Sequence, residues 1–120
     1  MKFKESVTYD DLLLVPQYSD IQSRSEVDIT SFLGHHELKL PIMASPMDTV
    51  SELSMAQAMS EAGGMAVIHR YNTIEEQQSI AAQFFSNSGW KGTMAAAIGV
   101  TGDFLERTEA LIATGTNVIC

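Results

Sequence analysis

The chain has 120 residues, 45% of them hydrophobic, and 7 Lys and Arg stand against 15 Asp and Glu, for a formal net charge of −8. This composition is typical of globular proteins and excludes disordered, collagenous and strongly basic chains, so DNA and RNA are not expected as partners. No run approaches the ~20 apolar residues of a membrane span, the N-terminus has no apolar signal core, and no Cys or His residues have metal-ligand spacing, so we expect a cytoplasmic protein with no membrane partner and no metal site.

Residues 1–38 are predicted to form an irregular N-terminal arm. It contains one apolar run, residues 12–15, which Pro16 ends. From Lys39 onward, short apolar runs alternate with longer segments of helical period, separated by turn residues. This alternation is typical of βαβ units.

Three such units are expected, followed by the start of a fourth strand. Capping-box pairs, in which a Thr precedes a Glu by three residues, are expected to begin the first two helices, at Thr49 and Thr73. Gly63 and Gly64 are expected to end the first helix. The predicted strands cover residues 40–44, 65–68 and 93–98 and begin again at 117; the predicted helices cover 51–62, 73–86 and 103–113.

The predicted strands are apolar throughout, so both faces of the sheet must be covered, as in parallel sheets. A doubly wound sheet and a (β/α)₈ TIM barrel both fit this pattern. The first strand is followed by residues 45–50 and not by the G-x-G-x-x-G of a dinucleotide-binding sheet, which favours the barrel. Residues 39–120 would then be the first half of a barrel domain, and the apolar run at 117–120 indicates a fragment of a longer chain.

Ligands of parallel α/β proteins bind at the carboxyl ends of the strands, so the turns there are the candidate sites. After the first strand, Ser45 and a helix N-terminus could bind an anion, or they could simply form a turn and a cap. After the second, His69 and Arg70 could bind phosphate or take part in acid–base chemistry, or be satisfied structural groups. After the third, residues 99–102 have a G-x-x-G pattern that is more typical of an ordinary turn.

Two further residues are interpreted from their places in these elements. Cys120 lies in an apolar strand without a basic neighbour, so we expect a buried structural side chain and not a nucleophile. Most methionines follow strand and helix periods and are expected in the core, whereas Met47 lies in the first candidate turn.

Four segments together resemble the opening of the IMP dehydrogenase / GMP reductase family. They follow one another in the family's order along nearly the whole chain, which makes the resemblance more specific than any single motif. The segments are Thr8 to Pro16, Ser45 to Glu52, Gly63 to His69 and Ala96 to Asp103.

The resemblance implies a TIM barrel, usually a homotetramer, that acts on purine nucleoside 5′-monophosphates with NAD, or NADPH in the reductase, and with a monovalent cation such as K⁺ as a further candidate cofactor. Ser45 and Met47 would contact the substrate, and His69 and Arg70 would lie in the substrate or cofactor pocket. Thr8 would reach the cofactor of a neighbouring subunit. The family's catalytic cysteine lies beyond these 120 residues, so none of them is expected to be catalytic.

The resemblance favours an IMP dehydrogenase, which converts IMP, NAD⁺ and water to XMP and NADH through a cysteine thioimidate. GMP reductase, which forms IMP and ammonia from GMP and NADPH, is the alternative. Residues 85–91 join the second helix directly to the third strand, where most dehydrogenases carry a pair of CBS domains. A third reading is a half-barrel fragment that binds nucleotide without turnover, and the 120 residues alone are expected to be inactive.

Overall fold

Four short parallel strands form the centre of the molecule, in a computed structural model that describes residues 4–86 and 92–120. They pair in the order β3-β4-β5-β6, which is their order along the chain, and each is joined to the next through one helix. The predicted mixed α/β fold with a parallel sheet is confirmed. The strands are β3 (Met43–Ala44), β4 (Met65–Ile68), β5 (Ala95–Ala96) and β6 (Val118–Ile119), and the helices are α1 (Leu53–Glu61), α2 (Ile74–Ser86) and α3 (Phe104–Ala113).

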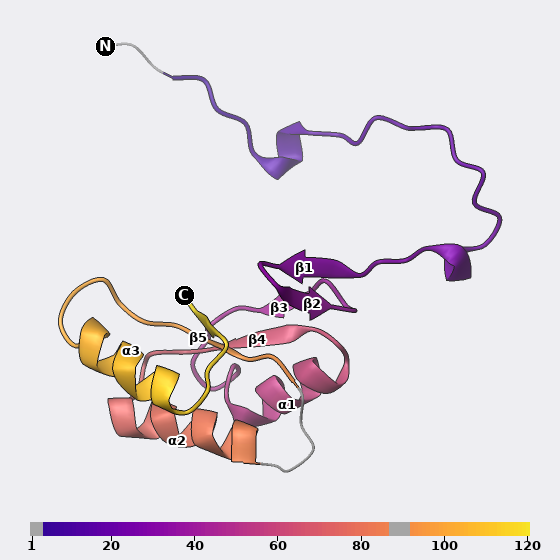
Figure 1. Cartoon of the computed structure of the whole chain (residues 1–120). Helices are drawn as coiled ribbons and strands as arrows, with labels where there is room; N and C mark the ends of the chain where they lie inside the picture. The colour runs from indigo at the N-terminus through magenta and orange to yellow at the C-terminus, as the bar shows by residue number, and fades with distance from the viewer. Residues whose placement is uncertain (1–3, 87–91) are drawn as a thin grey trace.

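All three helices cover the same face of the sheet (Figure 1). Their buried side chains, among them Ala56, Phe84 and Leu111, pack with Ile68 and Ala96 of the strands in one core cluster. A doubly wound sheet would carry helices on both faces, whereas strands in sequential order with helices on one face are the arrangement of a barrel wall. The described residues therefore have the architecture expected of part of an α/β barrel.

The opposite face of the sheet is covered in part by an antiparallel hairpin of β1 (Ser31–Leu33) and β2 (His36–Leu38) (Figure 1). Leu38 packs there against strand side chains such as Met65 and Ala95. Irregular structure was expected through residue 38, and this expectation is wrong for residues 31–38. The strands are three residues long and β1 is exposed throughout, so no alternating pattern marked them.

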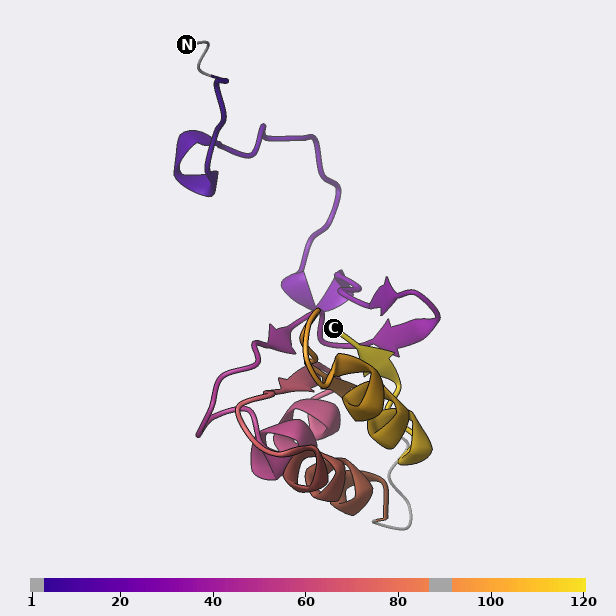
Figure 2. The same cartoon turned by 90° about the vertical axis from the view of Figure 1, so that its left-hand side faces the viewer.

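Residues 4–30 form an extended arm that runs away from the sheet and helices (Figure 2). Its only helical turns are two 3₁₀ segments, η1 (Tyr9–Asp11) and η2 (Arg24–Glu26). The apolar run recognised in the sequence is exposed, with Leu13 at 95% and Leu14 at 97%. These side chains make no contribution to the core of the described residues.

The predicted helix ends are confirmed at two of three places. The Thr73 amide donates to the Glu76 carboxylate at 2.9 Å and the Glu76 amide to Oγ1 of Thr73 at 3.2 Å, which is the capping box expected for α2. At the end of α1, Gly63 has a φ of 84°, and the amides of Gly63 and Gly64 donate to the carbonyls of Ser60 and Met59, a Schellman motif.

The capping box predicted for α1 is wrong. Thr49 adopts a left-handed conformation with a φ of 56°, and Glu52, three residues later, is the N-cap of the helix. The Ser51 amide instead donates to the carbonyl of Met47 at 2.8 Å, so the chain makes one extra turn before α1 begins.

Two further expectations, the start of the first strand and the burial of Cys120, need correction. The strand expected from residue 40 begins at Met43, because Pro41 has no amide and the Ile42 amide turns back to the Leu40 carbonyl at 2.8 Å. In α3, Leu105 is exposed whereas the charged Arg107 is buried. Cys120 is exposed at the end of β6, not buried.

In the described part of the chain, no helix has the length and apolarity that a membrane span requires.

Candidate functional site

The carboxyl ends of β3 to β6 form one edge of the sheet, called here the carboxyl edge, and the sequence places its candidate residues there. Ser45 and Met47 follow β3 and are exposed. His69 and Arg70 follow β4, the first buried and the second exposed. Thr8 is not brought to this edge: it lies in the arm, where its amide donates to the Asp11 carboxylate at 2.8 Å.

His69 is held on both of its ring nitrogens and is only 3% exposed. Its Nδ1 accepts a hydrogen bond from the Tyr71 amide at 3.2 Å, so Nε2 carries the proton of the neutral ring. That Nε2 faces a carboxylate oxygen of Glu52, at the start of α1, at 3.4 Å. The ring therefore joins the β4–α2 loop to α1, and in this arrangement neither nitrogen is available to a ligand.

Ser51 connects the loop that carries Ser45 to the end of β4. It is fully buried, and its hydroxyl donates to the carbonyl of Ser45. Its own carbonyl accepts from the His69 amide at 3.4 Å. The position of the Ser45 turn is thus set by a buried hydroxyl and by the neighbouring strand.

Gln77 joins the ends of β4 and β5 from inside the core. It lies on the buried face of α2 with no exposed surface. Its Nε2 donates to the carbonyl of His69 at 3.0 Å and to that of Ala97 at 2.9 Å. The two N–H groups of the side-chain amide thus serve as donors for two carbonyls that the hydrogen bonds between β4 and β5 do not satisfy.

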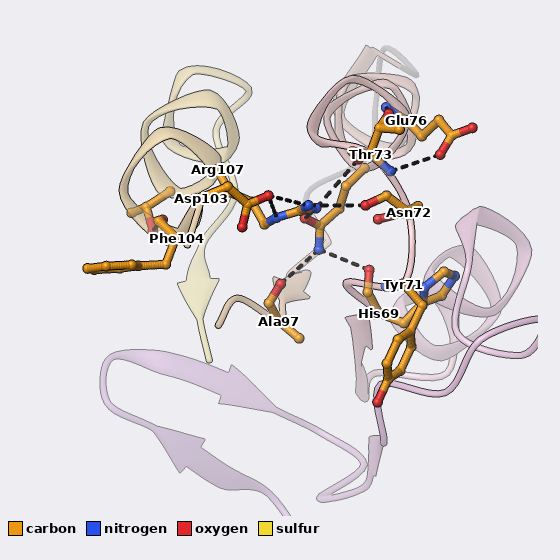
Figure 3. Close-up of polar contacts among 11 residues, drawn as sticks. His69, Tyr71, Asn72, Thr73, Glu76, Ala97, Asp103, Phe104 and Arg107 are labelled. Atoms are coloured by element: carbon orange, nitrogen blue, oxygen red, sulfur yellow. Dashed lines mark hydrogen bonds and ion pairs between the residues drawn. The ribbon is translucent and has the colours of Figure 1, made fainter. Parts of the chain in front are cut away.

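Arg107 reaches from α3 to the β4–α2 loop, as Figure 3 shows. Its Nη1 donates to Oε1 of Gln77 at 2.9 Å, and its Nη2 donates to the carbonyl of Asn72 at 3.1 Å and to the Asp103 carboxylate at 2.7 Å. The hydrogen bond from Arg107 lowers the pKa of Asp103 below its usual value. The guanidinium is thereby paired with a carboxylate and hydrogen-bonded to a loop at the same time.

Ser51, His69, Gln77 and Arg107 are the buried polar or charged side chains in the described residues 4–86 and 92–120. The hydrogen bonds above connect all four in one chain, which we call the carboxyl-edge network. It runs from α3 through α2 and the β4–α2 loop to the turn after β3. Buried polar groups that are fully paired fix a single local geometry, so the network rigidifies the edge at which a ligand is expected.

Arg70 projects from the loop that this network holds. Its guanidinium carbon lies 5.8 Å from the centre of the Tyr71 ring, and its Nη1 is 3.6 Å from where a side chain at Gly99 would begin. Among the ion pairs between described residues, Arg70 has none. An exposed guanidinium with no described carboxylate in ion-pair contact, lying at the ends of β4 and β5, can bind an anionic group such as a phosphate.

An open cavity of about 450 Å³ lies beside the edge, between the N-cap of α1, the β4–α2 loop and the first turns of α2. Glu52, His69, Tyr71 and Glu76 are among its lining residues, whereas Ser45, Met47 and Arg70 are not. Asn72 also lines it, and its Oδ1 is buried without a hydrogen-bond partner in the described structure. No group of three or more His, Cys, Asp or Glu placed to hold a metal ion is found in residues 4–86 and 92–120.

The sequence analysis did not identify Gln77 and Arg107 as candidate residues, although the sequence contains a pattern that indicates their burial. Gln77 stands in register with Ala81 and Phe84 on the apolar face of α2, and Arg107 stands one turn before Leu111 on that of α3. A polar residue within an apolar helical stripe must find a buried partner. The pattern thus indicates burial but not which atoms the side chain will meet.

Comparisons with known proteins indicate the same family over most of the chain. The model of the IMP dehydrogenase / GMP reductase domain matches residues 6–120. An inosine-5′-monophosphate dehydrogenase of Nitrosopumilus maritimus is 54% identical over 78 residues, which are 64% of this chain and 16% of that protein. A GMP reductase of Leishmania donovani is 47% identical over 74 residues, which are 61% of this chain and 15% of that protein. The matched part of the chain thus spans about a sixth of the length of these relatives.

Proposed function

Because the chain belongs to the IMP dehydrogenase / GMP reductase family, we propose that it is the opening part of the catalytic domain of a purine nucleotide oxidoreductase, and specifically of an IMP dehydrogenase. The observation that carries the proposal is the family match over residues 6–120, together with a carboxyl edge that exposes a hydroxyl and an unpaired guanidinium. The reaction converts IMP, NAD⁺ and water to XMP and NADH. Cys120 is exposed at the end of β6, but it does not match the position of the family's catalytic cysteine, so we expect the 120 residues to be inactive by themselves.

The chain's own contribution is to bind and orient phosphate-bearing ligands. The exposed hydroxyl of Ser45 can donate to a ribose or phosphate oxygen, and Met47 offers apolar surface beside it. Arg70 supplies a positive charge for a phosphate, which fits both the nucleotide and the cofactor. NAD⁺ supplies the hydride acceptor when bound. His69 acts here as a structural group, because both ring nitrogens are already engaged.

The proposed fold of the complete protein is a (β/α)₈ barrel. The sequential strand order and the single helix-covered face support it, and the strand face around Met65 and Ala95 would become part of the barrel interior. Residues 87–94 are all that separates α2 from β5, so no CBS pair is inserted there. Residues 4–38 are the described part of the proposed N-terminal arm, although Leu38 of β2 packs on the sheet.

The exposed arm supports the proposed homotetramer. Leu13, Leu14 and Tyr18 are more than nine-tenths exposed, and apolar surface of this extent is typical of a segment that packs on another subunit. Thr8, which follows the family pattern, would thereby approach the cofactor of a neighbouring subunit. Replacing Thr8 by Ala is then expected to raise the KM for the cofactor and to leave nucleotide affinity unchanged.

GMP reductase is the second candidate, and the similarity to the Leishmania donovani reductase favours it. Product analysis on the full-length protein distinguishes the two. Incubation with IMP and NAD⁺ is expected to yield XMP and NADH in equal amounts, while GMP and NADPH are expected to yield nothing. IMP and ammonia in the second reaction would establish the reductase, and no product in either reaction would refute the proposed oxidoreductase.

A further inference from the structure

The β4–α2 loop is held from the inside at both of its ends. The carbonyl of His69, at the start of the loop, accepts from Gln77, and the carbonyl of Asn72, at its end, accepts from Arg107. Nη1 of Arg107 also donates to the carbonyl oxygen of Thr73 at 3.5 Å. Arg70 and Tyr71, between the two held positions, are the exposed tip of the loop.

A buried arginine such as Arg107 would not be needed to hold the β4–α2 loop if it contributed to stability alone. It is 6% exposed, and burial of a guanidinium costs free energy that a well-packed apolar side chain would avoid. Its guanidinium donates to two main-chain carbonyls of the loop and to the side chain of Gln77. Asp103 is its one negatively charged partner among the described residues. A planar fork with several donors fixes the loop in one place, which apolar packing does not.

Arg70 is the side chain whose place depends on this loop. It has no ion-pair partner among the described residues, and its Nη1 lies close to Gly99, where a side chain would start only 3.6 Å away. No described carboxylate lies within ion-pair distance of it, and Asp103 attracts it only at longer range, so the direction of its guanidinium is set mainly by the backbone of residues 69–73 and by the Tyr71 ring. A shift of that backbone would move the charge away from the end of β5.

We propose that Arg107 is a positioning residue that acts through the β4–α2 loop on Arg70, which in turn binds a phosphate group at the carboxyl edge. The phosphate belongs either to the nucleoside monophosphate or to the dinucleotide cofactor. The proposal rests on the proposed function. Arg107 does not touch the ligand, and its effect on binding passes entirely through Arg70.

A kinetic cycle on the full-length enzyme tests this, with KM measured separately for nucleotide and cofactor. Charge-assisted hydrogen bonds to phosphate are strong enough that Arg70→Ala is expected to raise one of the two KM values about tenfold or more. Arg107→Met is expected to raise the same KM by a similar factor, and Arg107→Lys, which keeps the charge but not the fork, by less. The identity of the affected KM tells which phosphate is bound.

The decisive comparison is made in the Arg70→Ala background, where Arg107→Met and Arg107→Lys are expected to change the KM less than about twofold. Leu111→Ala, in the same helix and buried but outside the network, serves as the control: it is expected to lower stability and leave both KM values unchanged. Equal effects of the Arg107 variants with and without Arg70, or an unchanged KM in folded Arg107→Lys, would overturn the proposal. Absence of turnover in the wild-type protein with either substrate pair would instead refute the proposed function on which it rests.

Discussion

Replacement of Gln77 by Leu removes the centre of the carboxyl-edge network while keeping nearly the same side-chain volume. Gln77 has no exposed surface, so water does not replace the bonds that it makes. The substitution leaves the carbonyls of His69 and Ala97 without their short hydrogen bonds and Nη1 of Arg107 with only the Thr73 carbonyl, at 3.5 Å. Three polar groups thus lose a partner in the interior.

The expected cost follows from these three groups. A buried polar group without a partner costs about 1–3 kcal/mol, and more when it is charged. Some relaxation of the loop toward solvent reduces the sum, so we expect Gln77→Leu to lower the free energy of unfolding by about 3–5 kcal/mol. This is a large part of the ~5–15 kcal/mol that stabilises a typical domain.

Equilibrium unfolding in urea measures this loss. Gln83→Leu is the matched control, because Gln83 lies in the same helix and is exposed, and its side chain bonds to Ser79 of its own helix at 3.1 and 3.2 Å. The control is expected to change stability by less than about 0.5 kcal/mol. A loss below about 1 kcal/mol for Gln77→Leu would show that the network is not energetically important and would refute the reasoning.

Three further predictions concern stability. Thr49→Gly is expected to raise the melting temperature slightly, because relief of the left-handed strain of about 1–2 kcal/mol exceeds the entropy cost of glycine, and an unchanged or lower Tm would contradict this. Gly64→Ala is expected to lower stability by about 1–3 kcal/mol, measured in urea, because its Cβ would lie 2.8 Å from the carbonyl of Ile42; a neutral effect would mean that the backbone yields there. Arg107 lowers the pKa of Asp103, so the stability that this carboxylate contributes is complete above pH 3.8 and lost as the pH falls below it. Asp103→Asn is therefore expected to be less stable than wild type at neutral pH and equally stable in acid, and a difference that persists in acid would exclude this pair as its cause.

The fold was predictable where local chemistry decides the structure. The four apolar residues of β4, the Thr73 box and the glycines after α1 are signals carried by neighbouring residues, and all three are confirmed. The start of α1 was not predictable in this way. There, the loop from Ser45 to Ser51 is shaped by the bond from the buried Ser51 hydroxyl to the Ser45 carbonyl and by the bond from the His69 amide, 18 residues later, to the Ser51 carbonyl. These bonds outweigh the capping preference of Thr49.

The candidate site divides in the same way. Strand ends could be located from the sequence, which placed Ser45, Met47, His69 and Arg70 at the carboxyl edge. The Glu52 partner of His69 lies 17 residues earlier, and Gln77 and Asn72, two partners of Arg107, lie 30 or more residues earlier, so pairwise spacing carries no trace of them. The Asp103–Arg107 pair, by contrast, has a spacing of four residues, at the start of α3, that the sequence shows directly. Such contacts depend on how the helices pack, which only the three-dimensional structure specifies.

A crystal structure of the full-length protein with bound IMP tests the central claim most directly, namely that the carboxyl edge of this chain belongs to the nucleotide site of a barrel oxidoreductase. We predict that β3 to β6 continue into a closed barrel and that IMP lies at the carboxyl edge, with the Ser45 hydroxyl within hydrogen-bonding distance of it. A nucleotide bound at the opposite edge or on the helix-covered face, or an open sheet with helices on both faces, would contradict the account.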